Sequence, residues 1–331
     1  MANAILVDFD SPDNWEFAST LASQTKEKWQ VLKFISNRNH GSIGQNIWRA
    51  IKYFYFPFKI FCQRKKYHRI IAWQQFYGLI LAFYLKFFRV TKAPEIIVMT
   101  FIYKDKQGLL GRLYKRFVRY AITSSHIKYL VVFSKAEPEY YAHIFNLPKE
   151  KFRAIRLGIE DVEGQYDIRD EKYYLAAGRS NRDYDFLVSA WKDKEYKCEI
   201  ICDSYKRASS SPGVLIKTNC HGEAYFKKLA GCHGVIIPLA NKKISSGQLV
   251  ILQAMMLGKP IIVTTNDSIA DYLIDGQAGF VIEKKAKALD KALAEMKNPI
   301  TYNELSVSAR RCFEQYFTLA IMAQKVSELI H

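Results

Sequence analysis

Residues 244–280 read ISSGQLVILQAMMLGKPIIVTTNDSIADYLIDGQAGF, and this stretch decides the fold. The pattern predicts a small-residue loop, a helix over about 248–257, a Gly-Lys-Pro turn and a β-branched strand at 261–264. The backbone N–H groups of residues 245–247 and the positive end of the helix dipole would point the same way. The stretch therefore predicts a site for a phosphate-bearing ligand at the carboxyl edge of a parallel sheet.

The same stretch resembles the donor-nucleotide motif of the family 4 retaining glycosyltransferases (glycosyl transferases group 1), which have the GT-B fold. The resemblance is carried by Gln253-Ala254-Met255 and Gly258-Lys259-Pro260-Ile261-Ile262, in the family's order and spacing. Two glutamates of the family motif are absent, because Ser245 occupies the first position and Gln253 the second. The resemblance implies an α/β protein of two Rossmann-like doubly wound domains that face a cleft.

The length of 331 residues is sufficient for two domains, and 49% of the residues are hydrophobic. No apolar run is long enough to span a bilayer, and the start MANAILVDFD is better interpreted as a strand than as a signal peptide. Apolar segments alternate between strand-like and helix-like patterns along the chain, which favours doubly wound parallel sheets. We expect an acceptor-binding, membrane-facing domain at 1–158, a nucleotide-sugar-binding domain at 159–310, and a C-terminal helix at 311–331 that packs back toward the first domain.

Local patterns make three more specific predictions. A helix at 15–28 would be capped by Ser11 or Asp13. A basic-aromatic helix at about 43–66 would be kinked or split at Pro57. Residues 304–330 would form one helix.

The positive charge is concentrated in the first half of the chain. Residues 1–160 hold 26 Lys/Arg and 11 Asp/Glu, whereas residues 161–331 hold 23 and 21. Cationic side chains interleaved with aromatic ones are typical of proteins that bind an anionic membrane surface. Nucleic acid is the alternative partner, but the usual nucleic-acid motifs are missing, so we expect none. The predicted membrane-binding segments are 46–69, 83–92 and 111–120.

Six cysteines are scattered without the spacing of a disulfide framework or of paired zinc knuckles. Cys220-His221 and Cys232-His233 could suggest zinc, but reduced thiols are the better interpretation. The Asp8-Phe9-Asp10 triplet is interpreted as loop capping and not as a metal motif. We therefore expect no metal and no cofactor, with the nucleotide-sugar as a substrate, and a cytoplasmic protein peripheral on the cytosolic face of a membrane.

The resemblance implies how the donor would be held. Arg179, and Arg182 in place of the family's lysine, would neutralise the diphosphate as the glycosidic bond breaks. Gln253 would contact the ribose in the role of a glutamate, since an amide can still donate and accept hydrogen bonds. The donor-binding residues expected are Asn219, Cys220, Ser245, Ser246, Gly247, Gln248 and Gln253.

Polar residues that follow the first and third predicted strands are candidates for acceptor binding, namely Asp10, Ser11, Asn14, Gln74 and Gln75. The family's histidine after the fourth strand is absent, because Thr100-Phe101-Ile102 occupies that place. Family 4 enzymes are thought to react on one face of the sugar, with the leaving phosphate accepting the acceptor's proton. A protein nucleophile is then unnecessary.

The sequence thus predicts a metal-independent retaining glycosyltransferase that moves a sugar from a nucleotide-sugar to a glycan or lipid-linked acceptor in cell-surface polysaccharide or glycolipid synthesis. The missing glutamates and histidine motivate a second hypothesis, a non-catalytic GT-B homologue that acts as a scaffold or partner subunit in glycan assembly. A third hypothesis, a nucleic-acid binder, predicts an affinity that falls steeply with salt.

Overall fold

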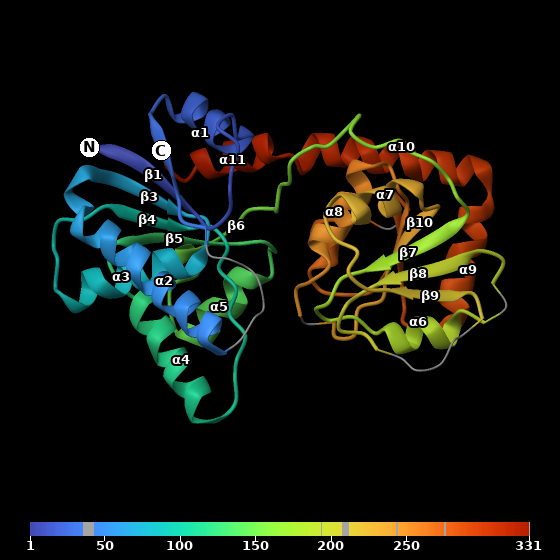
Figure 1. Cartoon of the computed structure of the whole chain (residues 1–331), viewed down its shortest axis with the longest axis horizontal. Coiled ribbons are helices and arrows are strands. Elements are labelled where there is room, and N and C mark those ends of the chain that lie inside the picture. The colour runs from blue at the N-terminus through green and yellow to red at the C-terminus, as the bar shows by residue number, and fades with distance from the viewer. Residues whose placement is uncertain (36–42, 193, 207–211, 243, 275, 331) are drawn as a thin grey trace. The chain divides into compact units, whose positions relative to one another are not determined.

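The chain folds into two compact units (Figure 1). Unit 1 comprises Met1–Ile155 and Ala323–His331, and unit 2 comprises Arg156–Met322. The computed structural model describes the chain except residues 36–42, 193, 207–211, 243, 275 and 331, and it describes only the backbone of residues 43–50. The units divide after Ile155, slightly before the predicted boundary at 158, and residues 311–322 belong to unit 2.

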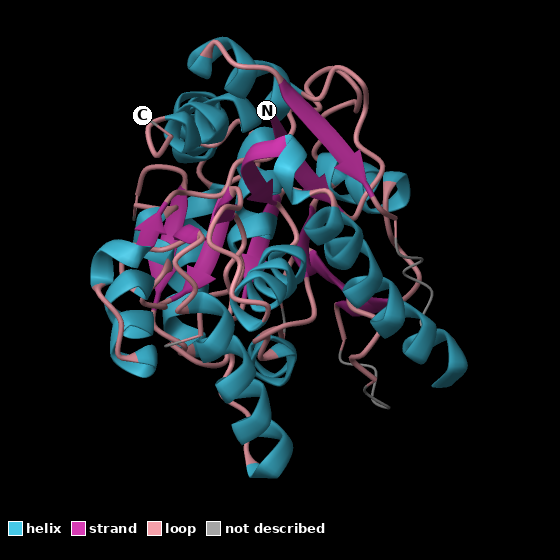
Figure 2. Ribbon diagram, turned by 90° about the vertical axis from the view of Figure 1, so that its left-hand side faces the viewer, coloured by secondary structure: helices cyan, strands magenta, loops and turns pink. Residues whose placement is uncertain are grey.

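Unit 1 is built on a six-stranded parallel sheet in the order β2-β1-β3-β4-β5-β6. Its strands are β1 (Ala2–Val7), β2 (Trp29–Lys33), β3 (Tyr67–Ala72), β4 (Glu95–Val98), β5 (Ile127–Val132) and β6 (Phe152–Ala154). The helices between them are α1 (Glu16–Thr25), α2 (Ile43–Cys62), α3 (Gln75–Phe87), α4 (Gly108–Ile122) and α5 (Glu137–Phe145). The central strands are continuous apolar runs because helices cover both faces of the sheet, as Figure 2 shows.

Unit 2 repeats this architecture with the order β12-β11-β10-β7-β8-β9. Its strands are β7 (Tyr173–Ala177), β8 (Lys197–Ile201), β9 (Val214–Lys217), β10 (Gly234–Ile237), β11 (Ile261–Thr264) and β12 (Gly279–Ile282). Its helices are α6 (Tyr184–Ala190), α7 (Glu223–Gly231), α8 (Gln248–Met256), α9 (Ala286–Lys297), α10 (Pro299–Tyr316) and α11 (Leu319–Ser327), the last of which continues into unit 1. The strand order reverses between β7 and β10, and ligands bind at the carboxyl ends of strands at such a switch point.

The predicted N-cap of the first helix was wrong, and Pro57 does not split the second. The first turn of α1 has Trp15 at its N-cap and no side-chain capping bond, so neither Ser11 nor Asp13 caps it. Ser11 lies buried, and its carbonyl oxygen accepts a hydrogen bond from the Lys33 ammonium. The helix α2 continues through Pro57 to Cys62, so the proline does not split it.

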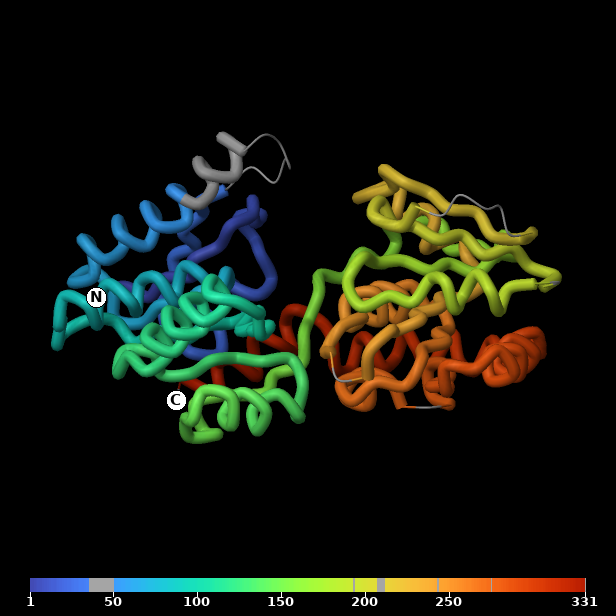
Figure 3. Tube along the Cα trace, turned by 90° about the horizontal axis from the view of Figure 1, so that it is seen from below, coloured from blue at the N-terminus to red at the C-terminus, as the bar shows by residue number. Residues whose placement is uncertain are grey.

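The predicted helix at 304–330 is in fact two helices, α10 and α11. The break lies at Thr318, which pairs with Ile159 of the connection between the units. The Ile159 N–H donates to the Phe317 carbonyl at 3.0 Å, and the Leu319 N–H donates to the Ile159 carbonyl at 3.1 Å. These strand-like bonds use backbone groups that a continuous helix would need, so the helix ends there (Figure 3).

The connection is also held to α10 by Arg310. The guanidinium binds the Asp161 carboxylate with two hydrogen bonds of 2.9 and 2.7 Å, and it contacts Glu163 at 2.8 Å. Burial alone would raise the pKa of Asp161, but the Arg310 hydrogen bonds lower that pKa below its usual range. The segment that enters unit 2 is therefore fixed by a charged pair as well as by backbone pairing.

Candidate functional site

The centre of the candidate site is the start of α8, directly after the loop that follows β10. Gly247 precedes the helix with φ +96°, a conformation that favours glycine. No side chain of the described residues caps the first turn, so its N–H groups are free to bind a ligand. The helix behind them is fixed in the core through Val250, Ile251 and Leu252. These amides lie where the sequence predicted an anion site.

Asn181, from the loop after β7, holds the β10–α8 loop in place. Its Nδ2 donates to the Asn241 carbonyl at 3.0 Å and to the Ser246 hydroxyl at 3.0 Å. Its Oδ1 accepts from the Asn241 N–H at 2.8 Å. Asn181 itself has φ +55°, a conformation that asparagine tolerates better than most residues. The two loops at the switch point are thus joined by one side chain.

Asn266, after β11, supports the same loop from the other side. Its Nδ2 donates to the carbonyls of Asn241 and Ile244, both at 3.0 Å, and its Oδ1 accepts from the Ser268 hydroxyl at 2.7 Å. Gln248 completes this network, because its Nε2 donates to the Ser245 hydroxyl at 2.6 Å and to the Ser268 hydroxyl at 3.3 Å. The loop is held by neutral amides and hydroxyls, and none of these bonds involves a carboxylate.

Arg182 lies at the carboxyl end of β7, next to this loop. Its Nε donates to the Ala177 carbonyl at 3.0 Å, and its Nη1 donates to the Ser180 carbonyl at 2.8 Å. The guanidinium packs against Gly178, where a Cβ atom would come within 2.7 Å of Nη2. The Tyr184 side chain also interacts with the guanidinium. Burial lowers the pKa of Arg182, yet its usual pKa is so high that the side chain stays charged.

Tyr225 of α7 is a site residue that the sequence analysis missed. Its hydroxyl donates to Oε1 of Gln253 at 3.1 Å, and burial raises the pKa of that hydroxyl. The positive charge of Arg182 acts to lower the pKa of Tyr225, which places the two side chains near each other. The bond fixes the Gln253 amide with its oxygen toward Tyr225 and leaves Nε2 as a donor.

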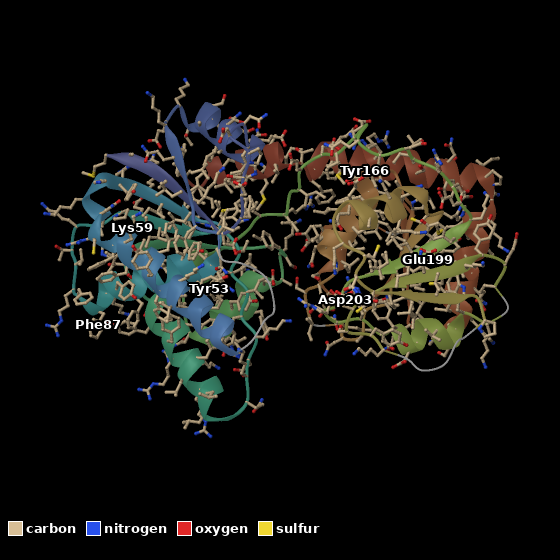
Figure 4. All side chains as sticks on the ribbon, in the orientation of Figure 1. Tyr53, Lys59, Phe87, Tyr166, Glu199 and Asp203 are labelled. Carbon is tan, nitrogen blue, oxygen red and sulfur yellow. The ribbon has the colours of Figure 1, made fainter. Side chains whose placement is uncertain are left out.

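The loops after β8 and β9 form the outer edge of the site. Asp203, labelled in Figure 4 just beyond β8, accepts from the Asn219 N–H at 2.8 Å and contacts the His221 ring at 2.9 Å. The Asn219 hydrogen bond, with His221 and Arg179, lowers the pKa of Asp203. Arg179 is therefore near this carboxylate, with its side chain exposed to solvent. Cys220 is half-buried and packs against the core of unit 2.

The structure thus brings the predicted donor-site residues together at one edge of the unit 2 sheet. Arg182, Ser245, Ser246, Gly247 and Gln248 belong to one connected set of loops, and Gln253 follows on the helix that those loops precede. Arg179, Asn219 and Cys220 lie after β7 and β9 on the same edge.

The predicted acceptor residues belong to unit 1, after the adjacent strands β1 and β3. Asp10 is exposed and pairs with Lys33 at 3.1 Å, and Asn14 is exposed. The Ser11 hydroxyl is buried without a hydrogen-bond partner among the described residues.

The two glutamines after β3 are occupied in supporting the local fold. The Gln74 side chain accepts from the Phe76 N–H at 2.5 Å and so caps α3, and its Nε2 donates to the Tyr53 hydroxyl at 3.3 Å. The Gln75 oxygen accepts from the Ile102 N–H at 3.0 Å. Both side chains therefore shape this edge of unit 1.

The described residues contain no cluster of three or more His, Cys, Asp or Glu side chains suited to a metal ion. Among their helices, none combines the length and the apolar character that crossing a bilayer requires.

Two parallel six-stranded sheets with flanking helices define the GT-B class of fold, and solved structures of that class match almost the whole chain. A sucrose-phosphate synthase from Thermosynechococcus elongatus matches with a TM-score of 0.71 at 13% identity, over 99% of this chain and 98% of that one. Anabaena Alr3699/HepE in complex with UDP-glucose matches with a TM-score of 0.67 at 12% identity, over 100% of this chain and 99% of that one. WaaG, a glycosyltransferase involved in lipopolysaccharide biosynthesis, matches with a TM-score of 0.62 at 13% identity, over 99% of both chains.

Part of the sequence also matches a family model. Residues 173–298 match the model of the family Glycosyl transferases group 1, and they include β7 and the whole α8 region. A comparison with curated proteins found no match. The chain is therefore a glycosyltransferase of the GT-B fold, and a region of unit 2 is similar to Glycosyl transferases group 1.

Proposed function

We propose that the chain is a metal-independent retaining glycosyltransferase that moves a sugar from a nucleotide-sugar to a glycan or lipid-linked acceptor in cell-surface polysaccharide or glycolipid synthesis. The observation that carries the proposal is the uncapped start of α8, whose preceding loop is held by Asn181 and Asn266 and pairs at Leu239 with the backbone of Arg182. An anion is the ligand that such a helix start binds best. The nucleotide-sugar complex of Anabaena HepE, a protein of the same fold, supports this choice of donor.

In this proposal the α8 amides and Arg182 neutralise the diphosphate. Negative charge develops on the leaving phosphate as the glycosidic bond breaks. Hydrogen-bonding groups that are already in place therefore stabilise the transition state without reorganisation. The network around Asn181 and Asn266 supplies that preorganisation. The leaving phosphate accepts the proton of the acceptor hydroxyl on the same face of the sugar, which retains the configuration. Divalent metal is not required, because the amides and the guanidinium perform its electrostatic role.

The remaining donor contacts follow from the same edge of the sheet. Gln253, oriented by Tyr225, donates to a ribose hydroxyl through Nε2. The loop at Asn219 and Cys220, held by Asp203, contacts the base. Arg179 contacts the diphosphate from the solvent side. The acceptor is bound by unit 1 at the carboxyl ends of β1 and β3, near Asp10, Ser11 and Asn14.

Unit 1 would act at the cytosolic surface of a membrane. In the described parts of 46–69 and 83–92, aromatic side chains lie exposed beside cations, with Phe54, Phe58, Phe87 and Phe88 all close to half exposed. Arg64 lies 4.8 Å from the centre of the Phe61 ring, and Lys86 lies 4.5 Å from that of Tyr120. Figure 4 shows Lys59 and Phe87 on the outside of the unit. Aromatic rings at headgroup level with flanking cations suit anionic lipids.

Donor binding is tested by calorimetric titration of the purified protein with a panel of nucleoside diphosphates. Turnover is tested by incubating the protein and a membrane extract with single nucleotide-sugars, with and without a chelator, while nucleoside diphosphate release is measured. We expect micromolar binding of one diphosphate and chelator-resistant release. Absence of binding by every diphosphate would overturn the proposal and favour the scaffold hypothesis.

A further inference from the structure

The first turns of α4 carry three leucines that the fold of unit 1 leaves uncovered. The exposed fractions of Leu109, Leu110 and Leu113 are 72%, 81% and 52%. Figure 1 shows α4 extending from the sheet of its own unit so that these turns stand clear of the neighbouring helices. We call Leu109, Leu110 and Leu113 the leucine cluster.

The leucine cluster is held in a defined shape. Gly111 is buried beneath the preceding loop, and a Cβ atom there would lie 1.9 Å from the Lys106 carbonyl oxygen. The ring of Tyr103 stacks on that of Tyr114 at 5.6 Å, and the Lys106 ammonium lies 4.8 Å from the centre of the Tyr114 ring. The loop therefore packs closely on the helix, and the cluster's exposure is a property of the fold.

Cations adjoin the leucines on the same helix. At 3.6 residues per turn, the leucine cluster spans an arc of about 100°, and Arg112, Arg116 and Arg119 occupy the arc beside it. All three arginines are exposed, and within the described residues none of them forms an ion pair. Residues 102–120 contain six Lys/Arg and one acidic residue, Asp105. Apolar and cationic strips side by side characterise helices that lie in a membrane interface.

The leucine cluster is also continuous with the aromatic surface of unit 1. Further along α4, the rings of Phe117 and Tyr120 contact Phe83 of α3 at 5.6 and 5.5 Å between centres. Phe83 in turn stacks on the exposed Phe87 at 5.7 Å. One apolar strip thus runs from Leu109 to Phe87, and it leads into the surface already assigned to the membrane.

We propose that the leucine cluster inserts into the acyl region of an anionic bilayer while Arg112, Arg116 and Arg119 bind the lipid phosphates. The proposal rests on the membrane association in the proposed function and adds the residues that penetrate. Leucines contribute little to binding a nucleic-acid backbone, whereas their burial in acyl chains is favourable. The charge next to them selects anionic lipids.

The test measures binding of the full chain to phosphatidylcholine vesicles with and without phosphatidylglycerol. The double variant Leu109→Gln/Leu110→Gln keeps the charge, and we expect it to bind the anionic vesicles at least about tenfold more weakly. The double variant Ile300→Gln/Val307→Gln is the matched control, since these α10 side chains of unit 2 are 71% and 60% exposed. Arg112→Gln/Arg116→Gln should lose the preference for phosphatidylglycerol.

Insertion itself is measured with Leu110→Trp and lipids brominated in the acyl chain. Quenching of the added fluorescence supports the proposal. Unchanged vesicle binding by the leucine variant, or an unquenched Trp at 110, would overturn it, as would RNA binding that depends on the arginines and not on the leucines. Nucleoside diphosphate titration separates the two proposals. The leucine variant should bind the diphosphate as the wild-type chain does, so a failure of vesicle binding leaves the donor site standing. A wild-type chain that binds vesicles but no diphosphate would overturn the donor site and leave the insertion standing.

Discussion

Arg182 and Arg179 differ in how the fold holds them. Arg182 is fixed by two backbone carbonyls at the end of β7, whereas Arg179 is exposed near Asp203. A half-buried guanidinium that is already held in place is preorganised for a phosphate, so its removal should affect the transition state most.

Replacing Arg182 by Met should lower kcat/KM for the donor by about 10- to 100-fold, since a hydrogen bond to a charged group contributes roughly 1.5–3 kcal/mol. Steady-state release of nucleoside diphosphate measures the effect. Arg311→Met, an exposed arginine on α10, serves as the control. A variant with wild-type kcat/KM would remove Arg182 from the site.

Arg179→Ala should also reduce turnover strongly while the fold stays intact. The exposed guanidinium supports little structure, so circular dichroism and the melting temperature should match the wild type. Diphosphate release then isolates its role in catalysis. Full activity of this variant would reject the assignment of Arg179.

Tyr225 acts through Gln253 and not on the phosphate. Tyr225→Phe removes the hydroxyl at 3.1 Å from Oε1 and frees the amide to rotate. We expect KM for the donor to rise about 2- to 10-fold with little change in kcat, because one neutral hydrogen bond contributes roughly 0.5–1.5 kcal/mol. Tyr140→Phe, at an exposed tyrosine of unit 1, is the control. An effect on kcat alone would contradict a positioning role.

At the scale of elements, the β10–α8 loop is shaped by amides that are distant in sequence. Asn181→Ala removes bonds to Asn241 and Ser246, which lie 60 and 65 positions away in the sequence. We expect the free energy of unfolding to fall by about 1–3 kcal/mol and the thermal shift caused by nucleoside diphosphate to shrink. Asn303→Ala, at an exposed position of α10, should change neither. A normal ligand-induced shift would show that the loop needs no such support.

The connection at Asp161 gives a pH-dependent prediction. Its pKa is lowered in the folded state, so the stabilisation is present above the unfolded-state pKa and is lost as the pH falls through the folded-state pKa. Asp161→Asn should therefore be less stable than the wild type at pH 7, and the two should converge in acid. Denaturant titrations at several pH values measure this, with Glu304→Gln as the control. A difference in the free energy of unfolding that does not change with pH would contradict the link between Asp161 ionisation and stability.

How far the sequence predicted these features depended on whether their causes are local. The start and end of α8 follow from Gly247 and Gly258, and β11 follows from its β-branched residues, so residues 244–280 predicted both elements correctly. The break between α10 and α11 depends on Ile159, far away in the chain, and no pattern near Thr318 signals it. Tyr225 and Asn181 escaped notice for the same reason, since each acts only through a partner on another element.

At the scale of the whole molecule, the two halves of the chain differ in charge. Residues 1–160 carry nearly all of the net charge of +17. Raising the salt concentration should therefore weaken binding to anionic vesicles about tenfold or more, because the Debye length shrinks to about 3 Å at 1 M. Nucleoside diphosphate binding should change less, since the Arg182 site is partly buried. Co-sedimentation and calorimetry on the same salt series compare the two, and salt-independent vesicle binding would contradict the electrostatic part of the proposal.

The pairing of Ile159 with Thr318 has a practical consequence for unit 2, the half that we propose binds the nucleotide-sugar. Because the chain enters and leaves unit 2 at adjacent points, residues 156–322 form a closed module whose two ends already meet. Such a module can be excised, or its ends joined by a short peptide, at a small entropic cost. The excised piece should fold alone and still recognise the nucleotide, which would allow donor specificity to be exchanged between related enzymes as a single cassette.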